Sequence, residues 1–143
     1  MIKISILTLL LTLPAVATAG ETRVVSYDGT FEDARFSVEN AIVNAGLVID
    51  YESHVGDMLN RTAEDVGSDV TLFKAADIFV FCSAAISREV MEEDPMNIAH
   101  CPYGIFVAEN QDGVMIGRRD YPDGAMDKVE ALLDGIIDEA VSF

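Results

Sequence analysis

Two cysteines are the residues of this chain best suited to chemistry, because a cysteine thiolate is both a nucleophile and a ligand for soft metals. Cys82 closes the apolar run Ile78-Phe79-Val80-Phe81, and Cys101 comes just before the next apolar segment. If these segments are neighbouring antiparallel strands, the connection between them begins and ends at the same edge of the sheet. We therefore expect the two sulfur atoms to lie close together.

A disulfide between Cys82 and Cys101 is the simplest role for this pair in an oxidising compartment. It would close a loop of about twenty residues and stabilise the fold by about 3 kcal/mol. A buried, free Cys82 that packs as a small apolar side chain, separate from Cys101, is the other structural interpretation.

A soft-ligand site is the alternative that assigns the cysteines a function. His100 is adjacent to Cys101, and Met91 and Met96 precede it. Thiolate, thioether and imidazole groups together suit Cu(I), so Cys82, His100, Cys101 and Met96 are the candidate ligands. His54 and Met58 are also four residues apart, but we interpret His54 as a hydrogen-bonded structural residue.

A thiol enzyme is the competing hypothesis. In it Cys101 is the nucleophile or redox centre, Cys82 is the resolving thiol, and protonated His100 lowers the pKa of Cys101. No Gly-x-Ser-x-Gly elbow and no glycine-rich phosphate loop is present in the sequence. We therefore favour a non-enzymatic binding protein for a small ligand, either a soft metal or a sulfur compound, with no cofactor required by the sequence.

The first 19 residues are expected to be a secretory signal peptide. Lys3 supplies a positive start, an apolar run follows, and Ala17-Thr18-Ala19 forms a small-residue cleavage site. The apolar run is too short to span a bilayer, and no second one follows. We therefore predict a periplasmic or secreted protein whose residues 20–143 form one domain without a membrane span.

The charge of the chain argues against binding to nucleic acid. Nine basic and 25 acidic residues give a net charge of −16, and removal of Lys3 with the leader makes the mature chain more acidic still. Such a surface repels phosphate backbones. Apart from the pair Arg118-Arg119, the remaining basic residues are dispersed, at Arg23, Arg35, Arg61, Lys74, Arg88 and Lys128. Homo-oligomerisation is left open by these data.

Periodicity and turn signals predict an α+β fold. Thr30 and Asp33 form a capping signal for a first helix that Gly46 ends, and Asp112-Gly113 is the turn of a hairpin. Strands are predicted at 23–27, 47–51, 78–82, 104–109 and 114–118, and helices at 31–45, 87–93 and 126–140. Residues 56–76 fit both a short helix ending before Gly67 and a strand. Because strands follow one another through tight turns, we expect an antiparallel sheet with helices packed on one face, a two-layer sandwich.

The order of these pieces resembles the domain-of-unknown-function 302 family of small bacterial domains. The resemblance extends from about Thr30 to Pro122. It rests on Phe31-Glu32-Asp33-Ala34, Gly46, His54, Gly67, the strand ending in Cys82, Asp94-Pro95, Cys101 before Ile105-Phe106-Val107, Asp112-Gly113, and Pro122. It implies an antiparallel sheet backed by helices, of the type seen in TATA-box-binding-protein-like domains.

The same resemblance implies that Cys82 and Cys101 belong to one site. Family members often carry cysteine at both positions, and some occur with periplasmic sulfur-compound metabolism, although no activity is established. They usually have Asn-Pro after the first cysteine and Pro before the second. Here Ser83-Ala84 and His100 replace these residues, so the loops of this chain are expected to differ from the family pattern.

Overall fold

A five-stranded antiparallel sheet forms the frame of the structure, a computed structural model that describes residues 22–142. The strands are β1 (Arg23–Tyr27), β2 (Ile49–Ser53), β3 (Ala75–Phe81), β4 (Tyr103–Glu109) and β5 (Val114–Arg118), and their spatial order is β1-β5-β4-β3-β2. Every neighbouring pair is antiparallel. This confirms the predicted α+β fold with an antiparallel sheet. The predicted leader, residues 1–19, lies outside the described residues.

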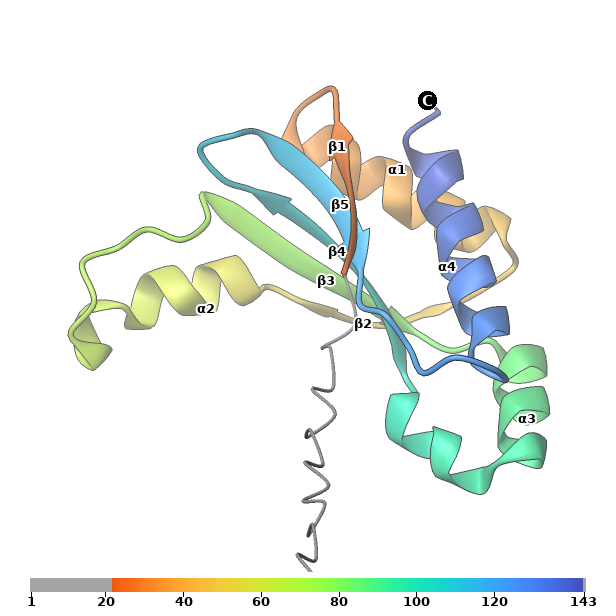
Figure 1. Ribbon diagram of the computed structural model, residues 1–143. Coiled ribbons are helices and arrows are strands. Elements are labelled where there is room, and N and C mark those ends of the chain that lie inside the picture. Colours follow the sequence, from red (N-terminus) through yellow and green to blue (C-terminus); the bar gives the residue numbers. More distant parts are fainter. Residues whose placement is uncertain (1–21, 143) are drawn as a thin grey trace, which may run out of the picture.

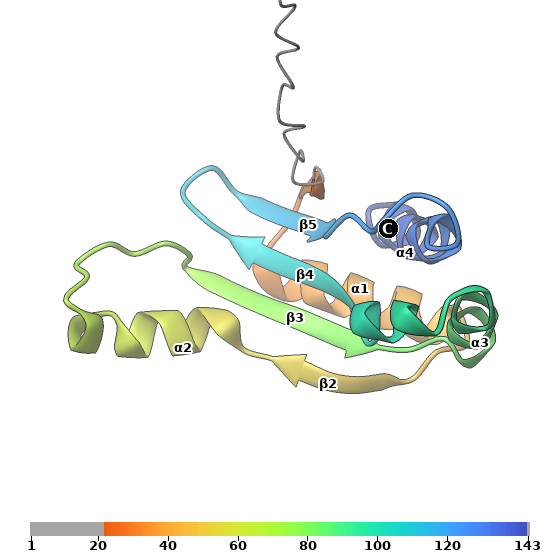
Figure 2. The ribbon, with the colours of Figure 1, turned by 60° about the horizontal axis from the view of Figure 1, so that its bottom comes forward.

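Four α-helices accompany the sheet: α1 (Phe31–Asn44), α2 (Val55–Thr62), α3 (Ala84–Glu93) and α4 (Asp127–Ala140), with short 3₁₀ helices η1 (Glu64–Val66) and η2 (Pro95–His100). Helices α1 and α4 lie side by side on one face of the sheet, α3 lies near one end of the sheet, and α2 projects from the other end (Figures 1 and 2). None of the helices within residues 22–142 is both long enough and apolar enough to cross a membrane.

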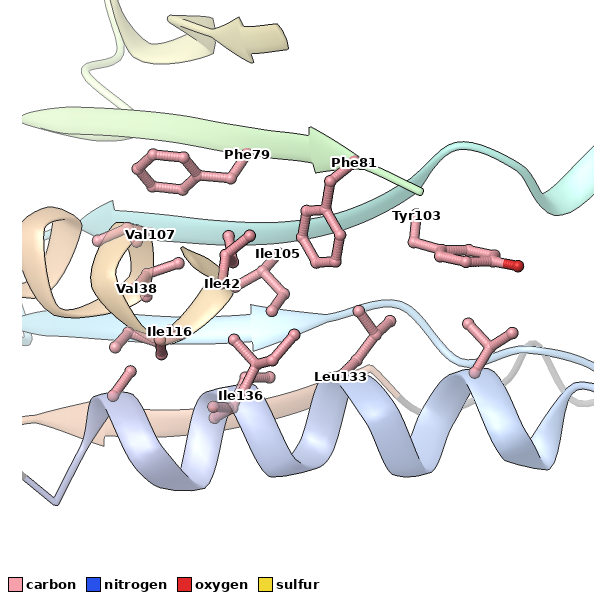
Figure 3. Packing of buried hydrophobic residues seen from close by; sticks show 14 of the residues in the cluster. Val38, Ile42, Phe79, Phe81, Tyr103, Ile105, Val107, Ile116, Leu133 and Ile136 are labelled. Carbon is pink, nitrogen blue, oxygen red and sulfur yellow. The ribbon is translucent and has the colours of Figure 1, made fainter. Parts of the chain in front are cut away.

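The hydrophobic core lies between the sheet and the pair α1–α4 (Figure 3). Strands alternate their side chains between two faces, so every second residue of β3, β4 and β5 points at these helices. The fully buried members include Val38, Ile42, Phe79, Phe81, Ile105, Val107, Ile116, Leu133 and Ile137. The helices meet this face with their buried residues, which include Ala34, Val38, Ala41 and Ile42 of α1 and Val129, Leu133, Ile136 and Ile137 of α4.

The opposite face of the sheet, here called the outer face, is also apolar. Its side chains are those of the alternate strand positions, including Ile78, Val80, Phe106 and Met115, which are half-buried. Val24 and Tyr51, on the strands at the two edges, are 48% and 64% exposed. This face therefore keeps contact with solvent.

Capping interactions explain where the elements begin and end. Thr30 and Asp33 form the predicted capping box of α1. At the other end Gly46 has φ 77°, and the Leu47 N–H donates to the Ile42 carbonyl at 3.2 Å. Because Leu47 belongs to this helix cap, the predicted strand 47–51 begins two residues later, at Ile49.

Two further boundaries differ from the sequence prediction. Strand β3 is Ala75–Phe81 and not 78–82, so Cys82 lies just beyond its end. Helix α3 begins after Ser83, whose hydroxyl accepts from the Ile86 N–H, and not at Ser87, which lies inside the helix. The ambiguous segment 56–76 contains most of α2, then η1, and the start of β3.

Candidate thiol site

The antiparallel pairing of β3 and β4 brings the two cysteines to one end of the sheet. Phe81, the last residue of β3, is opposite Tyr103, the first residue of β4. Cys82 follows the first of these strands, and Cys101 precedes the second by two residues. Both are half-buried free thiols, and Cys101 lies close enough to Cys82 to contribute to the raised pKa of the Cys82 thiol. The expected approach of the two sulfur atoms is therefore present, with α3 and η2 forming the connection between them.

Burial sets the protonation of Cys82. Loss of hydration raises the pKa of the Cys82 thiol to about 11, and the hydrogen bond and negative charge of Cys101 act in the same direction. Cys82 is consequently protonated at neutral pH. A thiol with so high a pKa is a weak nucleophile until a metal or a base removes its proton.

Two hydroxyl groups extend the site. The Ser87 hydroxyl lies 2.9 Å from the Tyr103 hydroxyl and 3.9 Å from the Cys101 sulfur. Ser87 comes from α3 and Tyr103 from β4, so the contact joins the helix to the sheet beside Cys101. Burial raises the pKa of the Tyr103 phenol, which keeps it a neutral donor or acceptor. Sequence reasoning interpreted Ser87 as a helix cap and did not select Tyr103.

Tyr121 is a further member of this region, and it was not among the predicted site residues. Its ring packs edge-on against Tyr103, with ring centroids 6.1 Å apart, and against His100, at 6.0 Å. Its hydroxyl is buried and has no hydrogen-bond partner among the described residues. Nothing in the local sequence signals this position, because the packing partners come from η2 and β4.

His100 lies at the end of η2 but does not complete a preformed metal site with the two cysteines. Within residues 22–142, Cys82, Cys101 and His100 do not form a set whose donor atoms lie within 4.8 Å of one another. The backbone carbonyl of His100 accepts from Arg119 at 3.0 Å. Met96 is 69% exposed on η2, and Met91 packs against the core. The structure thus brings the two thiols together. His100 and Met96 are close to Cys101 in the sequence but do not form a metal-ligand set with both thiols.

A comparison with protein-family models identifies the relatives of the chain. Residues 22–140 match the model described as "Domain of unknown function DUF302". The chain belongs to the DUF302 family. The resemblance stated from the sequence is thereby confirmed.

A solved structure of the same family supports the fold of this DUF302 domain. It is the crystal structure of an uncharacterized conserved DUF302 protein from Bacillus stearothermophilus, with a TM-score of 0.62 and 13% sequence identity. The match covers 85% of this chain and 95% of that one. At this identity the similarity concerns the fold. A search of curated proteins found no match.

A second polar cluster of this DUF302 domain lies at the opposite end of β3. Asp77 on β3 forms an ion pair with Arg35 on α1, at 2.7 Å, and lies 2.8 Å from the Nδ1 atom of His54. Arg35 also pairs with Glu52. The donor atoms of Glu52, His54 and Asp77 lie within 4.8 Å of one another, as in metal sites. However, the Arg35 guanidinium already pairs with both carboxylates, so we interpret this cluster as an ion-pair network. It agrees with the structural role predicted for His54.

Proposed function

We propose that this DUF302 domain is an exported, non-enzymatic binding protein whose site is the thiol pair Cys82 and Cys101. The ligand class is a soft one, Cu(I) or a thiol-reactive sulfur compound. The observation that carries the proposal is the placement of two free thiols side by side although 18 residues separate them in the chain. Export rests on the leader-like residues 1–19.

Thiolate chemistry supports a soft metal as the test ligand. Cysteine sulfur selects Cu(I) over hard cations, and a metal lowers the pKa of a thiol that it binds. The high pKa of Cys82 therefore does not prevent binding, although binding would release protons and be weaker at low pH. His100 and Met96 are close enough in the chain to add contacts, but two thiolates are the minimum site.

The proposal favours binding over catalysis for two reasons. Burial raises the pKa of Cys82, so this thiol lacks the lowered pKa that usually activates a nucleophile, and only Cys101 is left for that role. In addition, His100 is not held within metal-ligand spacing of both sulfur atoms. These features fit a site that binds a ligand rather than one that attacks a substrate.

The testing experiment begins with protein exported by its own leader and denatured without reductant. Thiol counting and intact mass on one sample should give two free thiols. The reduced, folded protein is then titrated with Cu(I) against a coloured chelator. We expect one Cu(I) per chain, loss of binding in Cys82→Ser and in Cys101→Ser, and retention in the matched soft-donor control Met58→Leu.

Two outcomes contradict the proposal. If Cu(I) and thiol-reactive sulfur compounds bind equally well to the wild type and to both serine variants, the thiols are not part of the site. No free thiols, a mass two hydrogens lighter, and resistance to mild reductants would instead indicate a structural disulfide. In that case the serine double variant should lose thermal stability and keep any binding activity.

A thiol redox function is the second candidate, because the two thiols differ in their surroundings. Cys82 has the raised pKa of a resolving thiol, and Cys101 lies beside the Ser87 hydroxyl. Rapid alkylation of Cys101 that slows in His100→Ala would support it. An alkylation rate that is ordinary for a free thiol and unchanged by His100→Ala would eliminate it.

A further inference from the structure

The outer face of the sheet carries a pocket separate from the thiol pair. Its volume is about 300 Å³, at the lower end of the range for small-ligand pockets. The lining includes Ile78 and Val80 of β3, Pro102, Gly104 and Phe106 of the β4 segment, and Arg119 after β5. Neither cysteine is part of this lining. Tyr103 also belongs to the lining, so the pocket borders the site of the proposed function but contains neither thiol.

A glycine near the start of the central strand lines the pocket. Gly104, the second residue of β4, is opposite Val80 on β3. A Cβ atom built there would lie 3.4 Å from the Ile78 Cγ2 atom, at the short end of ordinary contact distances. A larger side chain at this position would therefore extend from the outer face beside Ile78.

Phe106 forms one wall of the pocket. Its ring lies over Gly117 of β5, where a Cβ atom would collide with it. Because Gly117 has no side chain, the Phe106 ring can lie against β5 on the outer face. Together with Ile78 and Val80, this ring provides an apolar surface for a hydrocarbon or aromatic group.

Arg119 supplies the only charge in the lining. Six of the eight basic residues in the described part of the chain pair with carboxylates, namely Arg23, Arg35, Lys74, Arg88, Arg118 and Lys128. Within residues 22–142, Arg119 and Arg61 form no ion pair. The lack of an ion pair at Arg119 is unusual, because the protein has a large excess of carboxylates. Its guanidinium donates to the His100 carbonyl and lies 5.0 Å from the centre of the Tyr121 ring. The remaining N–H groups are free to bind an anion.

We propose that this pocket binds a small carboxylate with an apolar body, such as a short acyl or aromatic acid. The apolar part lies over Gly104, between Val80 and Phe106, and the carboxylate pairs with Arg119. A guanidinium matches a carboxylate with two parallel hydrogen bonds. A singly charged ligand is favoured over a phosphate, because the net charge of −16 repels multiply charged anions.

Hexanoate and 1-hexanol are a matched pair of probes, since they share a chain length and differ in charge. Backbone amide signals of residues 103–106 are followed by NMR during titration of the folded protein. We expect saturable shifts with hexanoate and weaker binding of hexanol. Arg119→Gln should weaken hexanoate binding about twofold to fivefold, as for an exposed ion pair. Arg61→Gln is the matched control and should change nothing.

Gly104→Val tests the lining of the pocket. The valine side chain should occupy the pocket and abolish hexanoate binding, and a dispersed NMR spectrum would verify that the variant folds. The Cys82→Ser, Cys101→Ser double variant should bind hexanoate like the wild type, which separates this site from the thiol site. If the double variant loses binding, the two sites are one and the proposal is wrong.

Three results would overturn the proposal. Shifts that do not saturate, or that spread evenly over the protein, indicate no site. Equal binding of hexanoate and hexanol, unchanged by Arg119→Gln, removes the role of the charge. A stable dimer that fails to bind hexanoate and becomes monomeric in Val80→Glu would show that a second copy of the chain covers the outer face.

Discussion

The guanidinium of Arg118 forms a two-pronged ion pair with Asp134, with Nε–Oδ1 and Nη2–Oδ2 distances of 2.6 and 3.1 Å. Arg118 is only 5% exposed, and it also pairs with Asp120 and Glu130. The hydrogen bonds of Arg118 hold the pKa of Asp134 below its usual range. This network joins the end of β5 to α4, and one buried cation pairs with three carboxylates, of which Asp134 also pairs with Arg23.

Arg118→Leu should therefore destabilise the protein strongly. The three carboxylates would lose their shared partner and repel one another, at a cost of about 3 kcal/mol in the free energy of unfolding. Urea unfolding measures this loss. Arg88→Leu, which breaks an exposed pair with Glu92 within α3, is the matched control and should cost less than about 0.5 kcal/mol. Equal effects of the two substitutions would contradict the assigned role of burial.

The thiol of Cys82 should make stability fall at alkaline pH. Its folded-state pKa is raised from 9.0 to about 11, so the protonated form is favoured by folding. This contribution is complete below about pH 9 and is lost as the pH rises through 11. Urea unfolding of the reduced protein between pH 8 and 11 should show a steeper decline for the wild type than for Cys82→Ser.

Removal of Cys101 should lower the pKa of Cys82 only in part. Burial, the main cause of the shift, remains in Cys101→Ser, whereas the hydrogen bond and charge of Cys101 are lost. Thiolate absorbance at 240 nm follows the titration. A Cys82 pKa of 9 or below in Cys101→Ser would show that burial is not the cause.

His54 should titrate above its ordinary pKa. The hydrogen bond to Asp77, and then the negative charge of that residue, raise the pKa of the His54 imidazole above 6.5. Its stabilising contribution is complete below pH 6.5 and disappears as the pH rises through the folded-state value. NMR titration, with His54 signals assigned through His54→Gln, measures the shift. A His54 pKa that is the same in Asp77→Asn as in the wild type would contradict this cause.

Gly56 should not tolerate a side chain. It is buried at the start of α2, and a Cβ atom there would collide with the backbone of Ala75 and Ala76. Gly56→Ala should destabilise the protein by about 1 to 3 kcal/mol, as overpacking does. In contrast, Gly135→Ala on the exposed side of α4 meets nothing within 4 Å and should add about 0.5 to 1 kcal/mol. Urea unfolding of the two variants tests this difference in sign.

Local features of the fold were predictable from the sequence because their causes are local. The capping pair Thr30 and Asp33, the left-handed Gly46, and the hairpin turn at Gly113 each depend on residues within a few positions. The helix stripes follow the 3.6-residue period of burial. The predicted boundaries were wrong where a distant or competing contact sets the end of an element. Leu47, for example, is part of the cap of α1 and therefore not part of β2.

The candidate site was predictable only in outline. Two cysteines flanking neighbouring strands indicate proximity, because antiparallel pairing brings the end of one strand to the start of the next. The membership of His100 in the site, which rests on its adjacency to Cys101 in the sequence, stays a prediction. The direction of a side chain at the end of η2 depends on its packing against Tyr121, which comes from beyond β5.

The sequence by itself determined the family, the α+β class, the acidic surface and the two thiols, because composition, period and local turn chemistry carry this information. Only the tertiary structure decided which groups meet. It placed Ser87 and Tyr103 beside Cys101, buried Arg118 among carboxylates, and left Arg119 beside an apolar hollow. These contacts join elements far apart in the chain, and the packing of the sheet against its helices sets their geometry.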